Sequence, residues 1–207
     1  MRIILTFSIL IFSLPLSAAS LNSLLIKGGK AYNRAQYGKA LDIYKLARQE
    51  DPSSDKAQFN TAASLYKLKD YPQAAALYKT VAGASEEFKQ DSYFNMGNAY
   101  FRAGDNAKAK AAYKKAILLN PRDKEAVHNL QILLQQNKEN EESENKKQDE
   151  DKEKNDQQGE NNDSNSQPDQ AQRDAERLIQ MAREQERKDR SRSREQYGEA
   201  GDVEKDW

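Results

Sequence analysis

The sequence contains no cysteine among its 207 residues, which excludes disulfides, thiolate metal ligands, thiol nucleophiles and lipid attachment at an N-terminal cysteine. Histidine occurs once, at His128, and tryptophan once, at Trp207. Net charge is lacking too, because 33 Lys and Arg residues balance 33 Asp and Glu residues. The chain as a whole therefore has no field that would draw it to nucleic acid or to an acidic membrane surface.

The sequence also lacks recognisable catalytic chemistry. His128 has polar neighbours and no partner that would make it a base or a metal ligand. There is no glycine-rich phosphate loop, no metal-ligand cluster and no nucleophile beside a base. We therefore predict a non-enzymatic protein with no cofactor, no metal, no small-molecule substrate and no nucleic-acid partner.

The one long apolar run lies at the N-terminus, between Ile3 and Leu16, and is followed by Ser17, Ala18 and Ala19. It is shorter than the roughly 20 residues that a membrane-spanning helix needs. Small residues at its end suit a signal peptidase, so residues 1–19 are predicted to be a signal peptide cleaved after Ala19. This predicts a periplasmic protein whose membrane contact is indirect. The alternative is an uncleaved anchor that keeps the protein membrane-associated.

Three segments resemble one another, at residues 29–52, 62–81 and 97–121. Alanine and tyrosine recur in them 34 and 35 residues apart, at Ala40, Ala74 and Ala109 and at Tyr44, Tyr78 and Tyr113. We expect two helices in each unit, with Gly97 and Ala62 allowing close approach. The predicted core rings and side chains are Tyr44, Tyr78 and Tyr113 on the second helices, with Tyr32, Leu65 and Tyr100 on the first.

The ends of the helices follow from local signals. Gly104-Asp105 predicts a turn within the third unit, while Asp51-Pro52 and Asn120-Pro121 predict the ends of second helices. In this alignment the segment between the two helices of the first unit, from Tyr32 to Tyr37, is one residue shorter than the segment from Tyr100 to Asn106 in the third. The sequence therefore predicts a tighter turn in the first unit.

These residues resemble the tetratricopeptide-repeat (TPR) family, and the third unit matches its pattern nearly throughout. The resemblance implies an all-α helical solenoid. We assign residues 20–136 to three repeats plus a capping helix, which begins at Asp123 and has no second helix behind it.

The remaining sequence is strongly charged. Residues 137–170 are predicted to be a disordered acidic linker, because almost no apolar residue is present there to form a core. Residues 171–195 predict a short amphipathic helix with a narrow apolar stripe, which we expect to order only against a partner. Binding of this helix to a membrane surface is the weaker alternative. Residues 196–207 are predicted to be a flexible tail, ending in Trp207.

A narrower resemblance comes from the order of these parts, together with the segments DAERLIQMAREQE (174–186) and VEKDW (203–207). The arrangement resembles the TPR proteins of bacterial Bat (aerotolerance) operons. The resemblance implies a periplasmic adaptor for membrane-anchored von Willebrand A-type proteins and a MoxR-type ATPase, linked to stress tolerance. Alternatives are a scaffold for outer-membrane or cell-wall assembly, and a self-associating structural protein. The C-terminal docking candidates are Val203, Glu204, Lys205, Asp206 and Trp207.

The first helices of a TPR solenoid line a concave groove, which predicts a protein-binding surface. The candidate groove residues are Ile26, Lys30, Asn33 and Arg34 in the first repeat, Phe59, Ala63, Tyr66 and Lys67 in the second, and Phe94, Asn98, Phe101 and Arg102 in the third. Rings and cations together suit an acidic, partly apolar peptide.

The carboxylate clamp of chaperone-binding TPR proteins is not predicted in this groove. Four positions of such a clamp are occupied here by Ile26, Lys30, Asp91 and Asn95, and these side chains are not the ones that the clamp needs there. Only Asn60 fits, so the groove is not expected to recognise the C-terminus of a chaperone.

Overall fold

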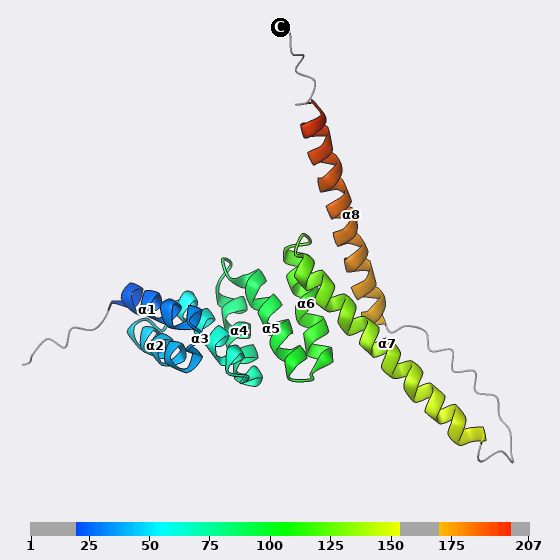
Figure 1. Cartoon of the computed structure of the whole chain (residues 1–207), viewed down its shortest axis with the longest axis horizontal. Helices are drawn as coiled ribbons and strands as arrows, with labels where there is room; N and C mark the ends of the chain where they lie inside the picture. The colour runs from blue at the N-terminus through cyan, green and yellow to red at the C-terminus, as the bar shows by residue number, and fades with distance from the viewer. Residues whose placement is uncertain (1–19, 154–169, 200–207) are drawn as a thin grey trace, which may run out of the picture.

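The computed structural model describes residues 20–153 and 170–199, and all regular elements in these ranges are α-helices (Figure 1). They are α1 (Leu21–Asn33), α2 (Tyr37–Glu50), α3 (Asp55–Lys67), α4 (Tyr71–Ala84), α5 (Lys89–Arg102), α6 (Asn106–Leu119), α7 (Lys124–Glu153) and α8 (Gln170–Glu199). The first six form three pairs that stack in chain order, and α7 and α8 close the far end (Figure 1). The all-α prediction is confirmed.

Polar caps explain where three of these helices begin. Side-chain oxygens of Ser54, Asp70 and Asp105 accept hydrogen bonds from backbone N–H groups three residues later, at the starts of α3, α4 and α6. Each bond satisfies a donor that the first helical turn leaves without a partner. The second helices of the first and third pairs end where predicted, because Asp51 and Asn120 leave the helical conformation before a proline.

All three turns within the pairs have the same length, so the prediction of a tighter first turn is wrong. Three residues separate the helices each time, and the middle one has a positive φ: 57° at Ala35, 67° at Lys69 and 81° at Gly104. The true counterpart of Gly97 is Gly28. A Cβ at Gly28 would meet the ring of Tyr44 at 2.5 Å, just as one at Gly97 would meet the ring of Tyr113 at 2.6 Å.

Tyrosines of the second helices form the core of the stack. Tyr44, Tyr78 and Tyr113 are each at most 3% exposed. Leu65 is also buried, but Tyr32 and Tyr100 are only partly so. The corresponding place in the first pair is taken by the buried Ala31.

The capping helix is longer than predicted and is covered by a second helix. α7 continues past Gln136 to Glu153 and therefore includes part of the predicted linker. The α8 side chains Ala175, Leu178, Ile179 and Ala182 are buried against Ala126, Leu130, Leu133 and Leu134 of α7 and against residues of α6. The C-terminal helix thus orders against its own chain. Residues 1–19, 154–169 and 200–207 of the predicted signal peptide, linker and tail lie outside the described residues.

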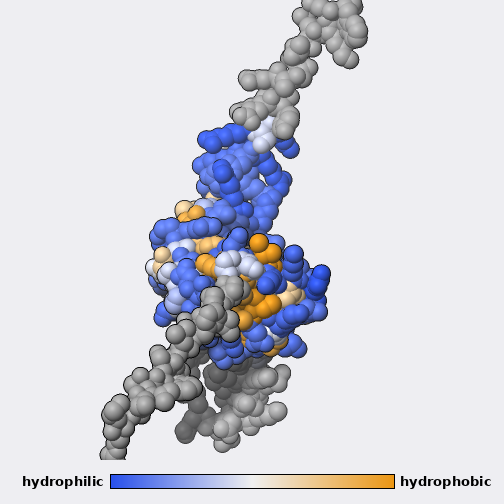
Figure 2. Space-filling view, turned by 90° about the vertical axis from the view of Figure 1, so that its left-hand side faces the viewer, coloured by the Kyte–Doolittle hydropathy of each residue, from blue (hydrophilic) through white to orange (hydrophobic). Residues whose placement is uncertain are grey.

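Figure 2 looks at the end of the stack formed by α1 and α2, where apolar surface lies among hydrophilic surface. The large apolar side chains most exposed on these two helices are Ile26 and Leu46, each about half exposed. Within residues 20–153 and 170–199, no helix is long and apolar enough to span a membrane.

Candidate functional site

The first helices of the three pairs line a groove that encloses a cavity of about 590 Å³. Side chains of α1, α3 and α5 make most of its wall, and Tyr44 and Tyr78 reach it from the second helices. The residues lining the groove are Leu25, Gly29, Tyr32, Asn33, Tyr44, Lys56, Phe59, Asn60, Ala63, Tyr66, Lys67, Tyr78, Asn95 and Asn98.

In the first repeat the predicted groove residues are displaced by one position. Ile26, Lys30 and Arg34 do not line the cavity, although Asn33 does. Their places are taken by Leu25, Gly29 and Tyr32. The displacement follows from aligning Gly29 rather than Gly28 with Gly97. The equal spacing of Gly28 to Tyr44 and Gly97 to Tyr113 is the sequence signal that identifies the correct register.

In the second repeat all four predicted residues line the cavity: Phe59, Ala63, Tyr66 and Lys67. Lys56 and Asn60, which lie on the same face of α3, join them. Phe59 packs edge-on against Tyr78, with ring centroids 5.3 Å apart. Such an edge-to-face contact is a favourable arrangement of two aromatic rings and holds Phe59 in the groove wall.

In the third repeat only Asn98 of the predicted residues lines the cavity, together with Asn95. Phe94 and Phe101 instead pack against the cluster formed by α6, α7 and α8. Arg102 lies over the ring of Tyr71 and donates a 3.4 Å hydrogen bond to the Tyr71 hydroxyl. Because α7 follows the third repeat and packs against it, Phe94 and Phe101 contribute to the contact with α7 and α8 and not to the groove wall.

Four asparagines give the groove its polar character: Asn33, Asn60, Asn95 and Asn98. Asn98 is held in place, because its Oδ1 accepts hydrogen bonds from the Tyr113 hydroxyl at 2.8 Å and from Asn129 Nδ2 at 2.9 Å. These bonds leave its amide nitrogen as a donor. Side-chain amides can both donate to and accept from a peptide backbone, so this row suits an extended polypeptide.

The charge of the groove comes from Lys56 and Lys67, since no acidic side chain lines it. Burial raises the pKa of the Tyr32, Tyr44, Tyr66 and Tyr78 hydroxyls, and neighbouring tyrosines raise it further. For Tyr66, the Arg102 cation partly opposes this rise in pKa. These hydroxyls therefore remain neutral hydrogen-bonding groups at physiological pH, and the groove stays cationic.

The groove presents groups that suit recognition of a polypeptide. Its walls contain amides, phenols, a phenyl ring and ammonium groups, but no carboxylate or imidazole. No group of three side chains that could hold a metal ion occurs in the part of the chain that the structure describes. The C-terminal docking candidates Val203 to Trp207 lie outside the described residues.

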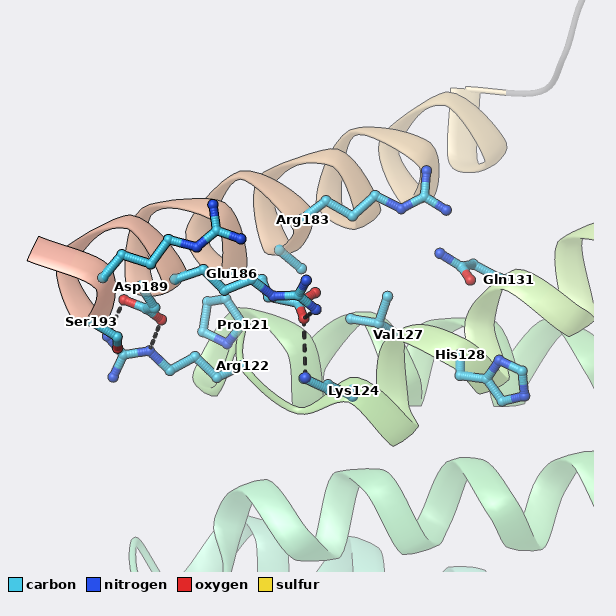
Figure 3. Close-up of a pocket in the computed structure, with 13 residues that line it drawn as sticks. Pro121, Arg122, Lys124, Val127, His128, Gln131, Arg183, Glu186, Asp189 and Ser193 are labelled. Carbon is cyan, nitrogen blue, oxygen red and sulfur yellow. Dashed lines mark hydrogen bonds and ion pairs between the residues drawn. The ribbon is translucent and has the colours of Figure 1, made fainter. Parts of the chain in front are cut away.

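A second cavity, of about 680 Å³, lies between the first turns of α7 and the second half of α8 (Figure 3). His128 is one of its lining residues. Sequence reasoning did not find this site, because it depends on where α8 packs. The only available signal was the amphipathic pattern of α8, which does not specify the surface that the helix covers.

Two tetratricopeptide-repeat family models match the chain, one over residues 29–87 and the other over residues 91–123. Human RNA polymerase II-associated protein 3 is 25% identical over 109 residues, which is 53% of this chain and 16% of that protein. Small glutamine-rich tetratricopeptide repeat-containing protein 2 of Mycosarcoma maydis is 27% identical over 103 residues, or 50% of this chain and 29% of that protein. The matches thus span less than a third of either relative.

Solved structures show the same fold. The first TPR domain of Spaghetti (RPAP3), bound to the HSP90 peptide SRMEEVD, aligns with a TM-score of 0.53 and 24% identity over 57% of this chain and 93% of that chain. The crystal structure of MamA aligns with a TM-score of 0.59 and 16% identity over 83% of this chain and 81% of that chain. Residues 29–87 and 91–123 are therefore tetratricopeptide repeats, which are non-catalytic modules for binding other proteins.

Proposed function

We propose that this protein is an exported adaptor whose groove binds an extended, acidic segment of a protein partner. The observation that carries the proposal is the composition of the groove wall, in which asparagines, tyrosines and two lysines occur without an acidic side chain. The ammonium groups of Lys56 and Lys67 would pair with carboxylates of the peptide. Asparagine amides would bond to its backbone, and the rings would pack against its apolar side chains.

The known relatives support a peptide as the ligand but not the same peptide. In the RPAP3 domain the bound segment is an acidic HSP90 peptide. In the corrected register, the first-repeat places of the chaperone clamp hold Leu25 and Gly29, and the third-repeat places hold Asp91 and Asn95. Asp91 would repel a carboxylate. We therefore propose an acidic partner segment other than a chaperone C-terminus.

A binding measurement tests the groove. The probe is a fluorescently labelled peptide of Glu, Leu and Gly, compared with the same peptide containing Gln in place of Glu. Because a charge-assisted hydrogen bond contributes about 1.5–3 kcal/mol, the double variant Lys56→Glu/Lys67→Glu should weaken binding of the acidic peptide at least about tenfold.

The matched control is Lys39→Glu/Lys45→Glu, which makes the same charge change at exposed positions of α2 that do not line the groove. This control should bind nearly as the unchanged protein does. Equal weakening by both double variants, or tight binding of the Gln peptide, would contradict recognition in the groove.

We further propose that the adaptor works in the periplasm, in an envelope complex of the Bat type with membrane-anchored von Willebrand A-type partners. The support is the N-terminal apolar run and the resemblance of residues 174–186 and 203–207. Mass spectrometry of protein from the native envelope should find Ser20 as the first residue. Affinity capture should recover a von Willebrand A-type protein with the full chain, but not with a chain lacking Val203 to Trp207. Capture of envelope-assembly proteins instead would favour the scaffold alternative.

A further inference from the structure

The cleft between α7 and α8 has an apolar floor and a cationic rim. Pro121, Val127 and Ala182 form the apolar part of its lining. Five cationic side chains line it against two acidic ones: the cations are Arg122, Lys124, Arg183, Arg190 and Arg194, and the acids are Glu186 and Asp189. The cleft therefore has an excess of positive charge.

Both acids are already engaged by cations of the cleft itself, as Figure 3 shows. Asp189 accepts hydrogen bonds from Arg122 Nε at 2.6 Å and Arg122 Nη2 at 2.9 Å. Glu186 lies 3.0 Å from Lys124 Nζ and 2.7 Å from Arg190 Nη2. These contacts lower the pKa of both carboxyl groups, so both stay ionised at neutral pH.

Two arginines of the cleft remain for a ligand. Neither Arg183 nor Arg194 forms an ion pair with any side chain that the structure describes. Together with Arg187 and Arg190 they are spaced four, three and four residues apart, so they lie in one stripe along α8. Arg187, Arg190 and Arg194 also line a neighbouring hollow of about 380 Å³. The cationic surface thus extends from the cleft along the helix.

The same chain carries a segment of opposite charge. Residues 139–153, the second half of α7, contain eight acidic residues against three lysines. This half of the helix extends away from the repeats (Figure 1). It belongs to the same continuous helix as Gln131, the last α7 residue in the cleft lining, and begins about 12 Å farther along the axis. The segment therefore cannot enter the cleft of its own chain while α7 stays helical.

We propose that the α7–α8 cleft is a binding site for acidic polypeptide and that its occupant is residues 139–153 of α7 in a second copy of this chain. The donor segment and the receiving cleft are different surfaces, so the contact is head-to-tail. After one such contact, one copy still has a free cleft and the other still has a free acidic segment, so assembly continues beyond a dimer. This assembly uses neither the groove nor its peptide.

Sedimentation velocity of the full chain, whose monomer mass is 23.6 kDa, tests the proposal. At about 50 mM NaCl the average mass should rise with protein concentration past the dimer, and at about 500 mM it should return to the monomer because salt screens the contact. The double variant Arg183→Glu/Arg194→Glu should need at least about tenfold more protein to associate. Neither arginine is in an ion pair that holds α8 among the described residues, so the variant should keep its circular dichroism spectrum.

Two further samples make the result specific. Lys39→Glu/Lys45→Glu makes the same charge change on α2 and should associate as the unchanged chain does. A chain with Glu144→Gln, Asp149→Asn, Glu150→Gln and Asp151→Asn should associate poorly alone, but mixed with the cleft variant it should form dimers and nothing larger. A chain that stays monomeric at low salt, or association that the cleft variant does not weaken, would overturn the proposal. A labelled peptide of residues 139–153 should bind the unchanged chain and should bind the cleft variant at least about tenfold more weakly. Equal binding to both would overturn the assignment of this segment to the cleft.

Discussion

Replacing Gly97 with alanine should destabilise the protein, although alanine favours helices more than glycine does. A Cβ at this position would lie 2.6 Å from two ring carbons of Tyr113 and 3.1 Å from a third. Tyr113 is 1% exposed, and its hydroxyl is bonded to Asn98 in the groove wall. The ring therefore cannot move aside without losing that bond or displacing the core.

The expected change in the free energy of unfolding has three contributions, of which one stabilises the protein and two destabilise it. Alanine in place of glycine within a helix contributes about 1 kcal/mol of stability. Overpacking a core costs about 1–3 kcal/mol, and loss of the bond between Tyr113 and Asn98 costs about 1 kcal/mol more. We therefore expect Gly97→Ala to lower the free energy of unfolding by about 1–3 kcal/mol.

Urea denaturation followed by circular dichroism measures this change. Gly83→Ala is the matched control, since Gly83 also lies in a helix and nothing lies within 4 Å of its would-be Cβ. That variant should gain about 0.5–1 kcal/mol. If Gly97→Ala were as stable as the unchanged protein, the close approach between α5 and α6 would not be a constraint, and the reasoning would be refuted.

Three further changes test other parts of the structure. Leu178→Asp places a charge in the buried contact between α8 and α7, so amide hydrogen exchange should accelerate across α8 while α1 to α4 keep their protection. Burial raises the pKa of Tyr78, so the stability that this residue contributes is fully present below the unfolded pKa of about 10 and is lost as pH rises above it. Urea titrations at several pH values should therefore show that Tyr78→Phe reduces this loss by about 1.4 kcal/mol per pH unit. Lys69 has a left-handed backbone conformation with φ of 67°, which is strained for a residue with a Cβ. Lys69→Gly should remove this strain and raise the free energy of unfolding by about 1 kcal/mol. An unchanged melting temperature in thermal scans would contradict the presence of strain at this residue.

The repeats could be predicted from the sequence because their signals are local. Spacing of Ala40, Ala74 and Ala109 specifies the second helices, and capping residues specify where helices begin and end. The capping signals depend on backbone bonds and side chains within about one helical turn, and the repeat period can be read along the chain without knowledge of any contact between helices. The all-α repeat architecture followed from them directly.

The error in the first repeat has a physical cause. Two adjacent glycines, Gly28 and Gly29, precede a single small and a single large residue, Ala31 and Tyr32. Either glycine satisfies the local pattern, so three groove residues were assigned one position too far along. The signal that distinguishes them, the equal spacing of Gly28 to Tyr44 and of Gly97 to Tyr113, joins two different helices, and its physical basis is the contact between Gly28 and the ring of Tyr44.

The sequence by itself determined that the chain would form stacked helix pairs with a charged C-terminal region, because helix signals and the absence of apolar residues act locally. Only the tertiary structure decided that α8 would cover α7 and that the Arg183–Arg194 stripe would border a cleft. The apolar stripe of a helix indicates that one face will be buried, but several surfaces of similar character can bury it. The choice among them depends on shape and on ion pairs between distant residues, such as Arg122 with Asp189, which no local pattern contains.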